Sequence, residues 1–158
     1  MLLDEAVVPL AQGLSALGVA ATYRVASLAR GYGDAASLSF TATPGPKALM
    51  PFAPVHARAK RGADGVTFSF IRCGRRDADS WEAFDIPLGE TSEAYRLDLF
   101  RNGSLVREIA ASTTALLYPA AQELADFGTA CSSFDIGLRQ VSAAVGPGFG
   151  LRTQVQVF

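Results

Sequence analysis

The chain has 158 residues, of which 49% are hydrophobic, and its 14 basic and 15 acidic side chains give a formal net charge of -1. This length supports one good hydrophobic core, or one core with a small satellite, but not two large domains. The near-neutral charge lacks the cationic surplus that neutralises many phosphates, so nucleic acid is not expected as a partner.

The amino-terminal segment is apolar, but it has the pattern of neither a signal peptide nor a membrane span. Asp4 and Glu5 stand where a signal peptide carries positive charge, and Pro9, Gly13 and Gly18 interrupt the apolar run. We therefore expect no membrane span and a soluble protein synthesised in the cytoplasm.

The first segment, residues 1–46, is predicted to be a small β-rich unit. Residues 19–27 and, more weakly, 37–43 alternate apolar and polar side chains as strands do, whereas 11–17 fit a helical turn equally well. Residues 43–47 carry two prolines flanking a glycine, which continue neither a strand ladder nor a helix. We place the domain boundary there.

The second segment, residues 47–158, is predicted to contain about seven short strands. They are expected at 54–61, 66–71, 94–99, 104–109, 113–118, 131–143 and 151–157. A short helical or turn-rich connection is expected at 120–127. Turn residues recur about every ten positions, which is the spacing typical of an antiparallel β-sandwich.

Two turns carry specific predictions. Asn102 and Gly103 form the strongest short hairpin signal, because both residues tolerate the positive φ of a tight turn. Gly148 and Gly150 are expected to supply positive φ where the chain reverses into its last strand. The glycine runs 31–33 and 146–150 are followed by no expected helix, so neither is predicted to hold a phosphate.

The two cysteines, Cys73 and Cys131, are too few for a disulfide scaffold and match no compact metal-ligand spacing. Two free, half-buried thiols are the simplest interpretation. The alternative is a bridge between two strands of a sandwich, and sequence alone does not establish the short Cα separation that such a bridge requires.

Few residue patterns suggest catalysis or metal binding. His56 is the only histidine, and no nucleophile elbow of the GxSxG type occurs. An acidic cluster lacks the spacing of a calcium loop; its members are Asp77, Asp79, Glu82 and Asp85. We predict no enzyme and no catalytic, cofactor-binding or metal-binding residues.

The candidate contact residues are Arg75, Arg76 and Trp81. Tryptophan beside arginine is the composition of interface hot spots and of sugar-stacking platforms. Packing of Trp81 over a sandwich edge is the competing interpretation. The last strand, 151–157, is a further candidate for contact through sheet augmentation.

The second segment resembles a fibronectin type III domain. The resemblance rests on Pro51 and Pro54 before the first strand, on a bulky aromatic side chain in the second strand, on the Tyr-x-Leu-x-Leu pattern at 95–99 and on the run VSAAVGPGFG. It implies an all-β protein, in which a small β-rich segment precedes a fibronectin type III-like antiparallel β-sandwich of about seven strands.

A narrower resemblance covers nearly the whole chain. The run from Pro51 to Ile109 is similar to the C-terminal part of the tail-tip baseplate hub ("megatron") protein of gene transfer agents and related tailed phages of α-proteobacteria. Its most specific elements are Arg-Arg, Asp-Ser-Trp, Pro-Leu-Gly-Glu and Ser-Glu-Ala-Tyr-Arg. Phe70 stands where family members usually carry tryptophan, and the family protein is far longer, with hub and barrel-like domains upstream.

This resemblance implies a non-enzymatic structural protein of the virion, made in the cytoplasm of a bacterial host and placed at the tail tip or baseplate. It would contribute to tail assembly and to host contact, and its partners would be other tail and baseplate proteins in a threefold assembly. The alternative is a receptor- or glycan-binding module at the host surface.

Overall fold

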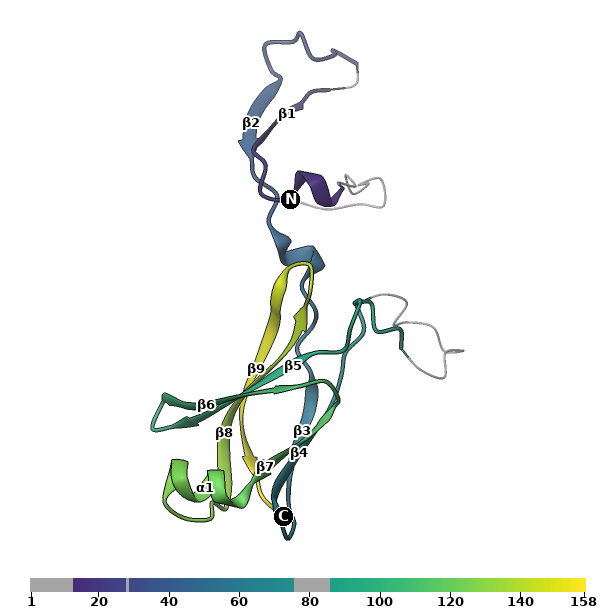
Figure 1. Ribbon diagram of the computed structural model, residues 1–158. Helices are drawn as coiled ribbons and strands as arrows, with labels where there is room; N and C mark the ends of the chain where they lie inside the picture. Colours follow the sequence, from purple (N-terminus) through teal and green to yellow (C-terminus); the bar gives the residue numbers. More distant parts are fainter. Residues whose placement is uncertain (1–12, 28, 76–85) are drawn as a thin grey trace. The chain divides into compact units, whose positions relative to one another are not determined.

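A computed structural model describes residues 13–27, 29–75 and 86–158 of the chain (Figure 1). The chain divides into two compact units, Met1–Ala48 and Leu49–Phe158. The predicted boundary followed residue 46, two residues before the end of the first unit. Residues at this boundary form a single 3-10 turn, η2 (Pro46–Leu49), because the fixed φ of proline suits the first position of a helix.

The described residues of the first unit form one antiparallel pair of strands. Strand β1 (Ala21–Val25) pairs with β2 (Leu38–Ala42), and the 3-10 turn η1 (Leu14–Ala16) precedes them. Both strands lie within the ranges predicted from alternation. The helical option for residues 11–17 is realised as η1, within the part of that range that the structure describes.

The second unit is a sandwich of two antiparallel sheets, with strand orders β3-β4-β7 and β6-β5-β8-β9. The strands are β3 (Val55–Arg61), β4 (Gly65–Ile71), β5 (Tyr95–Arg101), β6 (Ser104–Ala111), β7 (Ala115–Pro119), β8 (Ser133–Ser142) and β9 (Gly146–Gln156). One helix, α1 (Ala120–Phe127), connects β7 to β8 (Figure 1). The predicted fibronectin type III-like sandwich of about seven strands is confirmed.

The core lies between the two sheets, because alternate side chains of each strand point inward. The buried apolar side chains are Ala59, Val66, Phe68, Phe70, Tyr95, Leu97, Leu99, Leu116, Tyr118, Phe134, Ile136, Leu138 and Val155. Phe68 meets Phe134 edge to face with ring centroids 5.4 Å apart, and Phe70 meets Tyr95 at 4.8 Å. These pairs join the two sheets through aromatic contacts.

The hairpin between β5 and β6 forms as predicted. Asn102 and Gly103 both adopt positive φ, 51° and 81°, which is the backbone that a two-residue hairpin turn requires. Arg101 pairs with Ser104 directly across this turn.

The prediction for the last turn is wrong. The chain reverses at residues 143–145, and β9 begins at Gly146, which has a φ of 76°. Gly148 and Gly150 therefore lie inside the strand and do not have positive φ. Gly148 serves a different purpose, since a Cβ there would lie 2.5 Å from the carbonyl oxygen of Pro51.

The end of the chain connects the two sheets along one edge of the sandwich. Val157 forms a parallel bridge with Ala59 of β3, and Phe158 exchanges backbone hydrogen bonds with Ala59 and Arg61. Val157 therefore already has a strand partner. Sheet augmentation through the predicted segment 151–157 is restricted to residues 151–156.

Candidate functional site

Of the candidate contact residues Arg75, Arg76 and Trp81, Arg75 alone lies in the described part of the chain. Its guanidinium pairs with Glu90 at 3.5 Å, and both side chains are largely buried. Glu90 also accepts a 2.6 Å hydrogen bond from the hydroxyl of Ser142 on β8. Arg76, Trp81 and the acidic cluster fall outside the described residues, so the contact surface stays a prediction.

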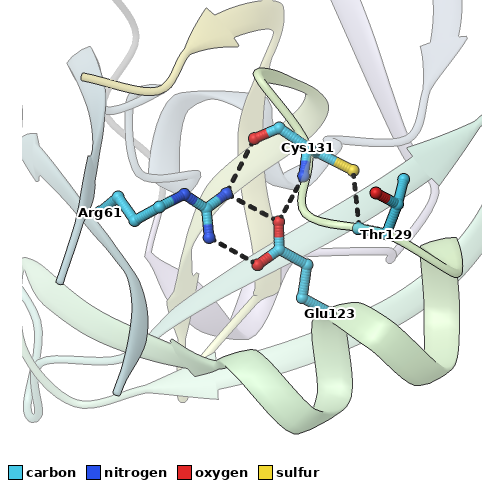
Figure 2. A network of polar contacts seen from close by, with 4 residues as sticks. All are labelled: Arg61, Glu123, Thr129 and Cys131. Carbon is cyan, nitrogen blue, oxygen red and sulfur yellow. Dashed lines mark hydrogen bonds and ion pairs between the residues drawn. The ribbon is translucent and has the colours of Figure 1, made fainter. Parts of the chain in front are cut away.

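Helix α1 is fixed by a buried carboxylate (Figure 2). Glu123 is 2% exposed, and both of its oxygens accept hydrogen bonds from the guanidinium of Arg61 at 2.9 Å. The backbone N–H of Cys131 donates to Glu123 at 2.7 Å, and Arg61 donates to the Cys131 carbonyl at 2.8 Å. The hydrogen bonds from Arg61 hold the pKa of Glu123 below its ordinary value.

A second carboxylate of α1 makes a similar set of contacts. Asp126 accepts hydrogen bonds at both oxygens from Arg107 of β6, and a 2.7 Å hydrogen bond from the hydroxyl of Tyr118 on β7. Arg107 lowers the pKa of Asp126, and burial raises the pKa of Tyr118. We call Glu123, Asp126 and their two arginines the α1 clamp. It ties β3 of the three-stranded sheet and β6 of the four-stranded sheet to one helix.

The α1 clamp predicts a loss of stability in acid. Its carboxyl pKa values are lower in the folded chain, so its contribution is complete above their ordinary values near 4 and is lost as the pH falls through the folded-state values. We expect urea denaturation at a series of pH values to show the free energy of unfolding falling below about pH 4. Glu123→Gln combined with Asp126→Asn should flatten that fall, whereas Glu108→Gln, which removes an exposed carboxylate, should not. An unchanged profile in the clamp variant would contradict this role.

The outer face of the four-stranded sheet is balanced in charge. Asp98, 3% exposed, lies between Arg96 at 3.2 Å and Arg139 at 3.3 Å. Arg152 binds Asp135 through two hydrogen bonds of 3.0 and 2.8 Å, and its guanidinium carbon lies 3.3 Å from the centroid of the Phe100 ring. The arginines of this face are therefore engaged within the sandwich.

The outer face of the three-stranded sheet is different. Arg58 and Lys60 of β3 point outward opposite Ser69 and Thr67 of β4, and both cations are exposed. Among the described residues, no carboxylate lies within 4.0 Å of either cation, as no salt bridge to them is formed. Exposed aliphatic side chains share the face: Val55, Ile71 and Leu117.

A hollow of about 370 Å³ opens beside Arg58 and is lined also by His56, Ser69, Phe70 and Ile71. The backbone creates it, because the register of β3 shifts between Val55 and Arg58 and His56 adopts a φ of 53°. Within the described chain, no hydrogen bond joins His56 to Ser69 or to a carboxylate. The arrangement therefore lacks the nucleophile and base pairing of a hydrolase.

The described residues contain no metal-binding cluster, no disulfide and no membrane-spanning helix. No group of three His, Cys, Asp or Glu side chains there is placed to hold a metal ion. Cys73 and Cys131 are free and half-buried, as in the simplest interpretation of the sequence, and the alternative of a disulfide between them is wrong. Burial raises the pKa of the Cys131 thiol. No helix in the described ranges is long and apolar enough to span a membrane.

The β1–β2 pair has one apolar face, made of Tyr23, Val25, Leu38 and Phe40, which we call the hairpin face. The Tyr23 and Phe40 rings stack with centroids 5.6 Å apart, while Val25, Leu38 and Phe40 are 57%, 70% and 51% exposed. The opposite face is polar and carries the pairs Thr22–Thr41 and Arg24–Ser39. No described element of the first unit covers the hairpin face.

Sequence reasoning missed the α1 clamp and the unpaired cations of β3. The spacing of Glu123 and Asp126 by three residues on an expected helix does place them on one face, and this signal was available. Their arginine partners lie 62 and 19 residues away along the chain, so no local pattern identifies them.

No protein-family model and no curated protein matches the chain. Among solved structures, the chain is similar to the crystal structure of the rat CD45 extracellular region, domains d3-d4. The alignment covers 98% of this chain and 72% of that chain, with a TM-score of 0.46 and 11% sequence identity. At this distance nothing about the function of the CD45 region transfers to the chain.

Proposed function

We propose that the chain is a non-enzymatic structural component of the tail tip or baseplate of a phage or gene transfer agent. The assignment to a tail tip is supported by four sequence elements of the chain that resemble those of the tail-tip hub family. They are Arg-Arg, Asp-Ser-Trp, Pro-Leu-Gly-Glu and Ser-Glu-Ala-Tyr-Arg. The observation that carries an assembly role is the exposure of Val25, Leu38 and Phe40 on the hairpin face, which no described element of the first unit covers.

The described parts of those elements have structural contacts. Arg75 of the Arg-Arg element pairs with Glu90 of the Pro-Leu-Gly-Glu element. Glu93, in Ser-Glu-Ala-Tyr-Arg, accepts a 2.8 Å hydrogen bond from the hydroxyl of Tyr95. Glu90 in turn accepts the hydrogen bond from Ser142 of β8, so the motif holds the segment before β5 on the sandwich, which supports a scaffold role for it.

Val25, Leu38 and Phe40 on the hairpin face support a role in assembly, because they stay exposed to solvent in the described part of the first unit. A two-stranded hairpin is marginally stable by itself, and it needs further strands or another packed surface on its apolar side. Burial of a leucine side chain stabilises by about 1.5–3 kcal/mol, so a neighbouring tail protein that covers Leu38 gains substantial affinity. We propose that such a neighbouring subunit packs on this face.

Incorporation of variants into particles tests this role. Leu38→Lys should reduce the amount of chain in purified particles by about tenfold or more, because a lysine ammonium resists burial at the contact. Thr41→Lys, with the same charge on the polar face of the hairpin, should be incorporated like the wild-type chain. Equal incorporation of both variants, each with an unchanged circular dichroism spectrum, would contradict a contact at the hairpin face.

A further inference from the structure

The three-stranded sheet presents a surface that the hairpin contact does not use. It consists of Arg58, Lys60, Val55, Ile71 and Leu117, and we call it the cationic face. Its charges differ from those of the opposite sheet, where each described outward arginine of β5, β8 and β9 has a carboxylate partner. The two cations of this face are instead left without an anion in the described chain.

The shape of the cationic face adds a second observation. The register shift in β3 opens the hollow of about 370 Å³ between Arg58 and Ile71, large enough to receive a side chain from another molecule. The hollow thus places the apolar side chains of Ile71 and Phe70 beside the guanidinium of Arg58. A complementary partner would carry an aliphatic group next to a carboxylate.

The charge and the side-chain types of the cationic face restrict the chemical class of the partner further. Covering exposed cations removes their hydration, and the cost is offset only if the partner supplies negative charge at the contact. Arg58 and Lys60 stand two residues apart, about 7 Å along the strand, which is the spacing of carboxylates at alternate positions of an extended segment. The exposed apolar side chains of this face are aliphatic, whereas sugar-binding platforms stack aromatic rings on the sugar.

We infer that the cationic face docks an acidic protein surface, on a different protein of the particle, that presents carboxylates to Arg58 and Lys60 and an aliphatic side chain to the hollow. This inference rests on the proposed tail function and names a second contact for it. The hairpin face takes an apolar neighbour, and the cationic face takes an acidic one.

Zero-length crosslinking of intact particles tests the inference. A carbodiimide joins a lysine amine to a carboxylate in contact with it, so mass spectrometry should find Lys60 linked to an aspartate or glutamate of another virion protein. Lys60→Arg keeps the charge and should retain incorporation while abolishing that crosslink. Arg58→Glu with Lys60→Glu should reduce incorporation by about tenfold or more. The control Lys47→Glu with Arg101→Glu, which changes net charge equally, should not reduce it.

Several results would overturn the inference while leaving the tail function intact. In the first, the wild-type chain is present in particles but its Lys60 reacts with an acetylating reagent, and the Arg58→Glu, Lys60→Glu variant is incorporated normally. Others are crosslinks from Lys60 only to a second copy of this chain, or a protected Lys60 that forms no carboxylate crosslink, which would indicate a glycan or another anion. Absence of the wild-type chain from particles would overturn the tail function, and this contact with it.

Discussion

Glu123→Ala is expected to lower the free energy of unfolding of the sandwich by about 3 kcal/mol. The change leaves Arg61 without its anion and the backbone N–H of Cys131 without its acceptor. The Arg61 side chain is 35% exposed and regains part of its hydration, so the loss should lie at the low end of the range for broken buried ion pairs.

Urea denaturation of the full chain, followed by circular dichroism, measures this loss. Gln122→Ala is the matched control, because it truncates an exposed neighbour on the same helix and should change stability by less than about 0.5 kcal/mol. A double-mutant cycle with Arg61→Ala should show a coupling energy above about 1 kcal/mol. A Glu123→Ala chain as stable as the Gln122→Ala chain would contradict the role of the α1 clamp.

Gly65→Ala is expected to lower the free energy of unfolding of the sandwich by about 3 kcal/mol or more. Gly65 opens β4 with a φ of 144°, a backbone that L-residues rarely adopt. A Cβ there would lie 2.2 Å from the carbonyl oxygen of Tyr118 and 2.7 Å from the nitrogen of Ala120. Both clashes involve backbone atoms at the junction of β7 and α1, so a side-chain rotation cannot relieve them.

The matched control for Gly65→Ala lies three residues earlier. Gly62 has no positive φ, and a Cβ there meets its nearest atom at 3.8 Å, an ordinary contact. Thermal unfolding should therefore show a large drop in Tm for Gly65→Ala and little change for Gly62→Ala. Similar Tm values for the two variants would mean that β4 and the β7–α1 junction are not packed as described.

The strands were predictable wherever local pattern and tertiary environment agree. The residues of β5 alternate cleanly because one of its faces is buried, and the Asn102–Gly103 turn has a local backbone requirement. At 120–127 the sequence predicts a helical or turn-rich connection, since Pro119 ends the preceding strand, and the structure has helix α1 there.

The errors and omissions arise where distant segments meet. Gly148 reads as a turn residue, yet it is needed because Pro51, almost a hundred positions earlier, approaches its backbone. The backbone of Cys131 is likewise held by Arg61, which lies 70 residues earlier in the chain, and its thiol is free. Whether an arginine is neutralised also depends on strand pairing. Arg58 and Arg96 read alike in sequence, but among the residues that the structure describes only Arg96 has carboxylates beside it.

The ion pairs among the described residues hold the sandwich together internally, and we propose that the hairpin face and the cationic face serve contacts. The α1 clamp and the paired arginines of the four-stranded sheet account for the internal role. The two contact faces differ in chemistry, which would let one small chain bridge two different neighbours in a tail tip.

Mass-spectrometric quantification of the chain in gradient-purified particles from the bacterium that encodes it tests the central claim most directly. We predict that the chain is present at a fixed ratio to the major tail proteins, in a multiple of three copies per particle, as the resemblance to the hub family implies. Intact, infective or gene-transferring particles that lack the chain would contradict a structural role at the tail tip.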